Sequence, residues 1–455
     1  MASSNRILQA APRAPKVPQR GVRPIRAKYT RSQIEEWVGN EYIECLGDPA
    51  STRDLAKLMS YRPPYDESER AHSATNRRMY LRRLKRVYVP LTAQHSIAQT
   101  LGEMIRSGYE HRAPAKPEFH RYLQDLYDKK MSGDTVESAP DLDPICDSYA
   151  IIGISGVGKT RLVRRALAQF PKYVLHPKLG LHSIPYIIVE CPHNGTVKQL
   201  ILNFFKQLDK IIGTDYEGRL SKQRATNEAL IREVNAAATA YGIGLIVIDE
   251  IQHAAVAASE DAKKLFMNFI VRFVNESIAP VVLIGTMSSL DLITQDFRIA
   301  RRMMGALLKN YPPAREWNHF LKKIWRYQWT KKVTPLTPEL NAKMYARTQG
   351  VLSLASKLYR AVQRRAIDSG LEEITELLID TVANEEFARV QPMLDALASG
   401  DMKKLIKFGD LYVPEAIERR VRAKGKDSSM LLADMMDHIS EQTVEENGLQ
   451  AKAAA

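Results

Sequence analysis

One glycine-rich segment restricts the possible folds of this 455-residue chain more than any other feature. Residues 153–160 match the pattern G-x-x-x-x-G-K-[ST] at every position. An apolar run, Tyr149–Ile154, leads into the segment, and a helical stretch continues from it to Phe170. Glycines in this pattern let backbone N–H groups surround phosphate oxygens, and the start of the helix adds positive potential. The segment therefore predicts a strand, a phosphate-binding loop and a helix.

We expect this loop to bind the phosphates of a nucleotide. Lys159 should reach the β- and γ-phosphates, and the hydroxyl group of Thr160 should coordinate Mg²⁺. The ligands predicted for the site are therefore ATP and Mg²⁺. The residues expected to contact the nucleotide are Gly153, Ser155, Gly156, Val157, Gly158, Lys159, Thr160 and Arg161.

An acidic pair follows a second apolar run. The run Leu245–Ile248 ends in Asp249 and Glu250, and in parallel α/β sheets the carboxyl ends of the strands carry the ligand site. Asp249 is expected to hold the hydrated Mg²⁺ together with Thr160, and Glu250 is expected to orient and deprotonate the attacking water. The two motifs together predict ATP hydrolysis.

Two more apolar runs, Tyr186–Glu190 and Val281–Ile284, have the continuous Ile- and Val-rich character of strands that are covered on both faces. The runs alternate with helical stretches, which predicts a doubly wound α/β domain with a parallel sheet. The helical stretches are Thr160–Phe170, Thr196–Ile212, Arg224–Ala240 and Ala262–Asn275. Because one strand intervenes between the loop and the acidic pair, we expect the additional-strand topology of hydrolysing ATPases. Thr286 follows the last run, where it can contact the γ-phosphate and the lytic water; its alternative role is to cap the segment Ser288–Leu292.

Composition changes along the chain and predicts five segments. Residues 1–30 contain seven Lys or Arg, four Pro and no acid, which is typical of a disordered arm. The strand pattern stops after residue 313, and four helical stretches predict a lid: 314–329, 338–348, 352–369 and 372–388. The segments are a basic arm (1–30), a helical N-terminal extension (31–120), the α/β core (121–313), a helical lid (314–395) and a flexible tail that changes from basic to acidic (396–455).

The net charge of +14 suggests a polyanionic partner, because Lys and Arg release counterions from phosphates when they bind them. One basic stretch, Arg70–Arg86, has apolar residues at helical spacing, so its basic face is either solvated or binds DNA or a partner protein. No apolar run is long enough to span a membrane, and no signal-peptide core is present. The three cysteines lie far apart and offer neither a disulfide framework nor a zinc site. We therefore expect a cytoplasmic protein.

These motifs resemble those of the AAA+ ATPases, and more narrowly those of the TnsC/TniB family of transposition regulators. The resemblance covers roughly residues 88–390 and includes Leu283–Thr286, the lid turn Gly350–Leu354 and the upstream segment Ser107–Arg112. It implies an AAA+ α/β core with a parallel five-stranded sheet. It further implies that the protein is an ATPase of the bacterial cytosol that forms a ring or helical filament on duplex DNA. It also implies that a target-selection protein recruits this assembly, which in turn recruits and activates a transposase and disassembles on ATP hydrolysis.

The resemblance also implies roles for basic residues. Arg302 takes the role of an arginine finger that acts on the nucleotide of a neighbouring subunit, with Arg301 or Arg298 as alternatives. In the lid, Ser353 and Lys357 stand where many AAA+ proteins carry a nucleotide-sensing arginine.

Contacts with the DNA backbone follow from the same resemblance. They fall at the start and the end of the helix after the second strand, on Lys198, Lys210 and Thr214. The basic N-terminal and acidic C-terminal segments take the roles of binding the target selector and the transposase.

Two other functions are compatible with the core motifs. A replication initiator or helicase loader would share the fold and the chemistry, but no clear winged-helix pattern follows residue 390. A nucleotide-gated scaffold that binds only proteins would have little need of a water-activating acid such as Glu250. Transposase reading frames beside the gene would discriminate best between these functions.

Overall fold

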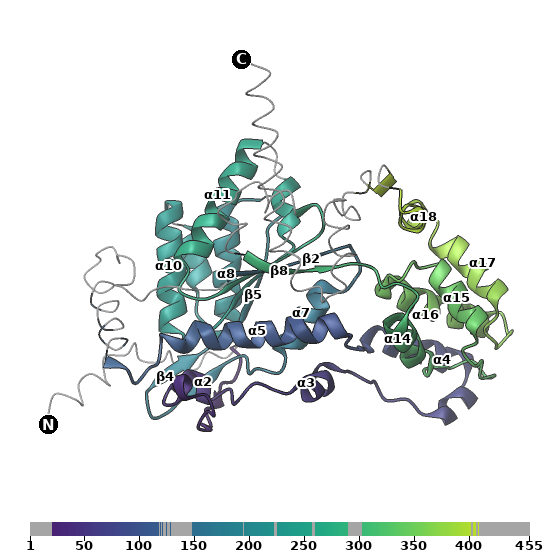
Figure 1. The fold of residues 1–455 in the computed structure, drawn as a ribbon, viewed down its shortest axis with the longest axis horizontal. Coiled ribbons are helices and arrows are strands. Elements are labelled where there is room, and N and C mark those ends of the chain that lie inside the picture. The colour runs from purple at the N-terminus through teal and green to yellow at the C-terminus, as the bar shows by residue number, and fades with distance from the viewer. Residues whose placement is uncertain are drawn as a thin grey trace, which may run out of the picture.

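The computed structural model of the chain describes residues 21–117, 119, 121, 124, 128, 148–193, 195–222, 225–256, 260–289, 303–401, 404, 405 and 408. A five-stranded sheet lies at the centre, helices pack around it, and a helical lid lies at one end (Figure 1). Within these residues, no helix combines the length and the apolar character needed to cross a bilayer.

The central sheet has the strand order β5-β6-β7-β2-β8, and every neighbouring pair is parallel. Its strands are β2 (Ser148–Gly153), β5 (Ile187–Glu190), β6 (Ile246–Asp249), β7 (Val281–Gly285) and β8 (Met303–Leu308). β7 lies between β2, which leads into the phosphate loop, and β6, which ends in Asp249. This order confirms the parallel five-stranded sheet and the additional-strand topology. The four apolar runs agree with β2, β5, β6 and β7 to within one residue at either end.

β8 is the strand that the apolar pattern does not reveal. Its sequence, MMGALL, lacks β-branched side chains and favours a helix by intrinsic propensity. It pairs with β2 from Ser148 opposite Met303 to Gly153 opposite Leu308. Parallel pairing at the edge of the sheet therefore overrides the local preference.

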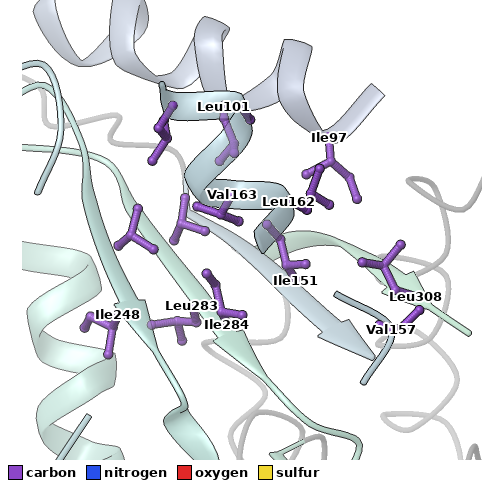
Figure 2. Close-up of a cluster of buried hydrophobic side chains, with 14 of the residues drawn as sticks. Ile97, Leu101, Ile151, Val157, Leu162, Val163, Ile248, Leu283, Ile284 and Leu308 are labelled. Atoms are coloured by element: carbon purple, nitrogen blue, oxygen red, sulfur yellow. The ribbon is translucent and has the colours of Figure 1, made fainter. Parts of the chain in front are cut away.

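Helices pack on both the sheet and one another. α8, α10 and α11 lie side by side (Figure 1). Figure 2 shows α7 between the sheet and α5, with Ile97 and Leu101 of α5 near Leu162 and Val163 of α7, which pack on Ile151 of β2. The helices of this region are α5 (Thr92–Glu110), α7 (Lys159–Leu167), α8 (Val197–Ile212), α9 (Tyr216–Ser221), α10 (Asn227–Ala240), η4 (Ile251–Val256) and α11 (Glu260–Glu276).

The N-terminal extension packs on the rest of the molecule. Its buried side chains join the same hydrophobic core as those of the sheet and the lid. Apart from α5, its elements are η1 (Glu35–Trp37), α2 (Glu41–Glu44), α3 (Thr52–Met59), η2 (Glu67–Ala71), α4 (Ala74–Tyr80) and η3 (Leu81–Arg86).

A second, three-stranded sheet includes part of the predicted basic arm. Its order is β1 (Ile25–Arg26), β3 (Val174–His176) and β4 (Leu181–Ser183). β1 runs parallel to β3, and the N–H group of Ile25 donates to the carbonyl oxygen of Tyr173 at 3.0 Å. The prediction of a disordered arm over 1–30 is therefore wrong for residues 21–30. Both residues of β1 are exposed, so backbone pairing forms the strand without the apolar pattern that the prediction required.

The segment Ser107–Arg112 fixes α5 to the start of β6. Gly108 lies so close to this region that a Cβ atom would be 2.7 Å from the carbonyl oxygen of Gly244. The hydroxyl of Tyr109 donates to Gly242 O (2.7 Å), and Arg112 Nη2 donates to Ile243 O (2.8 Å). The residues of this segment, which carry part of the family resemblance, thus hold the long helix α5 against the side of the sheet where β6 begins.

The lid contains α14 (Arg315–Trp325), α15 (Pro338–Ala346), α16 (Leu352–Asp368), α17 (Glu376–Glu386) and α18 (Gln391–Ser399). The first four lie within the four predicted stretches. α18 was not expected, and it crosses the predicted start of the tail at residue 396. α16 packs against α17 and against α4 of the extension.

The basic stretch Arg70–Arg86 joins the extension to the lid. Arg77 is 1% exposed and forms a bidentate ion pair with Glu372, with both distances 2.6 Å. Arg78 pairs with Asp368 at 3.2 Å. Neither predicted alternative, a solvated face or a face that binds DNA or a partner protein, holds for Arg77, because its side chain is buried against Glu372 of the lid. Arg78 stays partly exposed beside Asp368.

Candidate functional site

The phosphate loop connects β2 to α7, and all of β2 is buried. Gly156 and Gly158 have φ angles of 83° and 102°, which glycine adopts without steric cost. The Nζ atom of Lys159 donates to the carbonyl oxygens of Gly153 (2.7 Å) and Ile154 (3.1 Å). The loop therefore has the turned backbone that the motif predicts, and the ammonium group lies within it.

The loop also contacts the lid. A Cβ atom on Gly156 would be 2.6 Å from the Oγ atom of Ser353 in α16. Ser353 is one of the two lid residues expected in place of a sensing arginine. Lys357 lies one turn further along α16 and is exposed. Ser353 is thus the lid residue that lies at the loop.

Thr160 and Asp249 bring the two motifs together. Thr160 Oγ1 donates to Asp249 Oδ1 at 3.1 Å. Burial raises the pKa of the Asp249 carboxyl group and the charge of Glu250 adds to this effect, whereas the hydrogen bond from Thr160 opposes it. A hydroxyl and a carboxylate oxygen at the carboxyl end of the strands are the ligand type that Mg²⁺ prefers. The residues present therefore fit a bound Mg²⁺–nucleotide, as the sequence predicts.

Glu250 has a strained backbone. Its φ angle is 60°, and it is one of three non-glycine residues with positive φ in the described part of the chain. Its N–H group donates to Asp249 Oδ1 at 3.0 Å. Such a conformation costs roughly 1–3 kcal/mol and clusters at functional sites, where the surrounding structure enforces it. The strain marks the turn at which the chain leaves β6.

Gln252 is a site residue that the motifs did not reveal. Its Nε2 atom donates to Glu250 Oε2, and its Oε1 atom accepts from the N–H group of Thr286 at 3.2 Å. It therefore connects the two residues expected to handle the lytic water, across β6 and β7. The hydroxyl of Thr286 also shares a hydrogen bond of 2.8 Å with the hydroxyl of Ser288. Its alternative role as a helix cap stays a prediction, because residues 290–292 lie outside the described residues. The only signal in the sequence for Gln252 is its position two residues after Glu250.

Arg161 contacts the extension. Its Nη2 atom donates to Val87 O at 2.7 Å, and its guanidinium carbon lies 5.3 Å from the ring centre of Tyr88. Burial lowers the pKa of Arg161. The side chain thus ties α7 to the segment before α5, and its contact with a nucleotide stays a prediction.

A buried polar chain links the extension to the lid turn. The hydroxyl of Tyr88 donates to Gln94 Oε1 (2.8 Å), and Gln94 Nε2 donates to the hydroxyl of Tyr311 (3.2 Å). The N–H group of Tyr311 donates to Gly350 O at 3.2 Å. Burial raises the pKa of both tyrosines, so they stay neutral hydrogen-bonding groups. These residues were not predicted, because their partners come from separate segments.

The predicted DNA contacts lie at the two ends of α8. Lys198 and Lys210 are exposed, and Lys198 Nζ donates to Ser221 O at 3.1 Å. The hydroxyl of Thr214 donates to Asp209 Oδ1 at 2.5 Å, which stabilises the end of the helix. Their role on DNA stays a prediction.

The finger candidates Arg298, Arg301 and Arg302 lie outside the described residues. Arg302 directly precedes Met303, the first residue of β8. Its action on a neighbouring subunit stays a prediction.

Comparison with known proteins agrees with this fold. Residues 146–293 match a family model described as an AAA domain, and this range contains the phosphate loop, Asp249, Glu250 and Thr286. The match and the sheet order define this part of the chain as an AAA+ P-loop ATPase domain. No curated protein sequence matches the chain.

Several solved structures are similar to the chain. Orc1 of Aeropyrum pernix, in complex with DNA, is 17% identical with a TM-score of 0.38, over 60% of this chain and 65% of that chain. The chain thus spans less than two thirds of Orc1. The Walker-type ATPase PABY2304 of Pyrococcus abyssi is 15% identical with a TM-score of 0.37, over 70% of this chain and 95% of that chain. RuvB of Thermotoga maritima, a Holliday junction branch migration motor, is 16% identical with a TM-score of 0.29, over 59% of this chain and 68% of that chain. At these TM-scores the likenesses add nothing to the assignment.

Proposed function

We propose that the protein is an ATP-dependent, DNA-binding AAA+ ATPase that regulates DNA transposition. In this role it assembles on duplex DNA in the bacterial cytosol as a ring or helical filament. It connects a target-selection protein to a transposase and leaves the DNA when ATP is hydrolysed. The observation that carries the enzymatic part is the contact between Thr160 and Asp249, with Glu250 and Thr286 connected beside it through Gln252.

The chain's own residues divide the work of hydrolysis. The backbone N–H groups of the loop and Lys159 would hold the phosphates, while Thr160 and Asp249 would hold Mg²⁺. Bound Mg²⁺ would supply positive charge that offsets the negative charge of the phosphates. Glu250 accepts a proton from the attacking water. Gln252 orients the Glu250 carboxylate through the hydrogen bond to its Oε2 atom.

Three features support the DNA-bound role. The chain carries a net charge of +14. Lys198 and Lys210 are exposed on α8, whose apolar side faces the core. The segment Ser107–Arg112 carries the resemblance to transposition regulators, and transposase reading frames beside the gene are the expected genomic context.

The enzymatic part is tested by Glu250→Gln, because a carboxamide fills the same space but does not take a proton from water. We expect unchanged ATP affinity and a loss of steady-state turnover of about 10²-fold or more. Glu103→Gln, at an exposed position on α5, is the matched control and should hydrolyse ATP at the wild-type rate. Hydrolysis by Glu250→Gln within a few-fold of wild type would exclude Glu250 as the base.

The DNA-binding part is tested by Lys198→Ala. A phosphate contact carries no sequence information, so this change should weaken ATP-dependent binding to all duplexes and flatten its salt dependence. Lys178→Ala removes an exposed lysine between β3 and β4 and should leave binding unchanged. Filter binding at two salt concentrations measures both effects. If the wild-type protein did not bind duplex DNA in the presence of ATP, the scaffold function would be favoured. If Lys198→Ala left the salt dependence of DNA affinity unaltered, this lysine would not belong to the DNA site.

A further inference from the structure

A large groove lies between the N-terminal extension and the lid. Its volume is about 1050 Å³, and its walls come from residues 56–70, 87–95 and 319–336. No residue of the phosphate loop lines it. The volume is at the upper limit of small-molecule pockets, which run to about 1,000 Å³. The groove is therefore large enough for a segment of polypeptide, and it is separate from the nucleotide site.

The groove is strongly basic. Six Lys or Arg side chains line it against a single acid, Glu67, which is already paired with Arg70 at 3.0 Å. In the described part of the chain, no carboxylate lies within ion-pair distance of four of these cations: Arg62, Lys322, Lys323 and Arg326. At the same wall, burial and then the charges of Lys323 and Arg315 lower the pKa of His319. The groove therefore favours an anionic occupant.

Its lining is also partly apolar. Val87, Val89 and Leu336 contribute side chains to the walls, together with Val333, which is 55% exposed. The Nε2 atom of His95 is buried at this wall and has no hydrogen-bond partner among the described residues. The phosphates of a duplex would match only the cations of the lining, whereas a segment with acidic and apolar side chains would match both the cations and the apolar residues.

The chain itself contains such a segment. Residues 427–451 include six Asp or Glu and no Lys or Arg. In helical register, the apolar residues of this segment fall on one face: Leu431, Leu432, Met435, Met436 and Ile439. Asp434, Asp437 and Glu441 fall on the opposite face. The segment has the two kinds of side chain that the groove can bind.

We propose that residues 427–446 of the chain's own acidic tail bind in this groove. Leu405 and Phe408 pack against the hydrophobic core, and Phe408 is the last residue that the structure describes. The 22 residues from there to Met430 can extend to about 70 Å, and a lid of this size is roughly 30 Å across. The tail can therefore reach the groove of its own molecule. This inference does not depend on the proposed DNA-binding or transposition role.

Photo-crosslinking in the full-length protein tests the proposal. A benzoylphenylalanine replaces Met435, and mass spectrometry maps its crosslinks. We expect intramolecular crosslinks to residues 56–70 and 319–336, with a yield that does not depend on protein concentration. In wild-type background the yield should fall several-fold between about 0.05 M and 0.5 M salt, because salt screens the attraction.

Charge reversal separates this site from a general attraction. Lys322→Glu with Arg326→Glu should reduce the crosslinks several-fold, and Asp437→Lys with Glu441→Lys in the same chain should restore them. Lys264→Glu is the matched control, since Lys264 is exposed on α11 and does not line the groove, and it should leave the crosslinks intact.

Several outcomes would overturn the proposal. Crosslinks that map elsewhere, or that ignore both salt and charge reversal, would show that the tail does not occupy the groove. Crosslinks that form only between molecules and rise with concentration would assign the groove to a second copy. Duplex affinity lost with Lys322→Glu and Arg326→Glu, in a protein without tail crosslinks, would make the groove a nucleic-acid surface. ATP hydrolysis, measured in every variant, reports separately on the proposed enzyme.

Discussion

Replacing Arg77 with methionine should be among the most destabilising single changes in the joint between extension and lid. Arg77 is 1% exposed, donates twice to Glu372 at 2.6 Å, and donates to the carbonyl oxygen of Trp329 at 2.9 Å. Burial alone would raise the pKa of Glu372, but hydrogen bonds from Arg77 and from the N–H group of Lys331 hold it below its usual value. Arg77→Met leaves this carboxylate without its counter-charge, which for a buried pair costs about 3–5 kcal/mol.

The neighbouring arginine supplies a matched control. The side chains of Arg78 and Asp368 are 44% and 39% exposed, and they lie 3.2 Å apart. Such an exposed pair contributes about 0–1 kcal/mol. Arg78→Met removes the same charge one residue along α4, so the difference between the two variants measures the effect of burial.

Urea unfolding followed by tryptophan fluorescence measures both variants, because Trp317, Trp325 and Trp329 are buried in the lid. The double variant Arg77→Met with Glu372→Met removes both charges and should recover most of the lost stability, since an apolar pair of similar volume is often as stable as a buried ion pair. If Arg77→Met and Arg78→Met lowered the free energy of unfolding equally, the buried pair would not be what holds the extension to the lid.

Two further predictions concern the active site and the small sheet. Gln252→Ala should lower the turnover number about tenfold with unchanged ATP affinity, because Glu250 and Thr286 lose their connection and proton transfer depends on the position of the base; an unchanged turnover number would contradict the positioning role. Burial, and then the neighbouring His182, lower the pKa of His176 to about 4. The unfolded chain therefore binds a proton below about pH 6.5 while the folded protein does not, so stability should fall between pH 6.5 and 4 by up to about 1.4 kcal/mol per pH unit. The urea midpoint of unfolding should depend less on pH in His176→Gln than in the wild type over this range. An equal pH dependence in the two proteins would show that His176 does not titrate in this way.

The backbone of the phosphate loop and its position beside Asp249 were largely predictable because their geometry is local. The phosphate loop needs glycines at fixed spacing, and the run before Asp249 needs only burial on both faces. Gln252 was not predictable, since its role depends on β6 and β7 lying next to each other. The same holds for Arg161, which the motif places beside the nucleotide but which the structure engages with Val87.

The fold was predictable where the apolar pattern is strong, and it was missed where pairing alone forms the element. β8 has the composition of a helix, and the two residues of β1 are exposed. The ion pairs of the arginines in α4 could not be predicted from the sequence either. Their spacing indicates a basic helix, but the acids that neutralise Arg77 and Arg78 come from the lid, nearly three hundred residues away.

The contacts around the loop constrain how the lid can move. The lid touches the phosphate loop at Gly156, and Arg77 holds the lid to the extension. The extension is in turn held to α7, the helix that follows the loop, by the hydrogen bond from Arg161 to Val87. These three contacts connect the loop to the lid, the lid to the extension, and the extension back to the helix after the loop. The lid therefore cannot rotate away from the loop unless the buried ion pair of Arg77 breaks or the extension moves with the lid. The first route costs several kcal/mol. If nucleotide binding moves the lid, the lid and the extension should therefore move together. The groove between the lid and the extension should then keep its shape when a nucleotide binds to the phosphate loop.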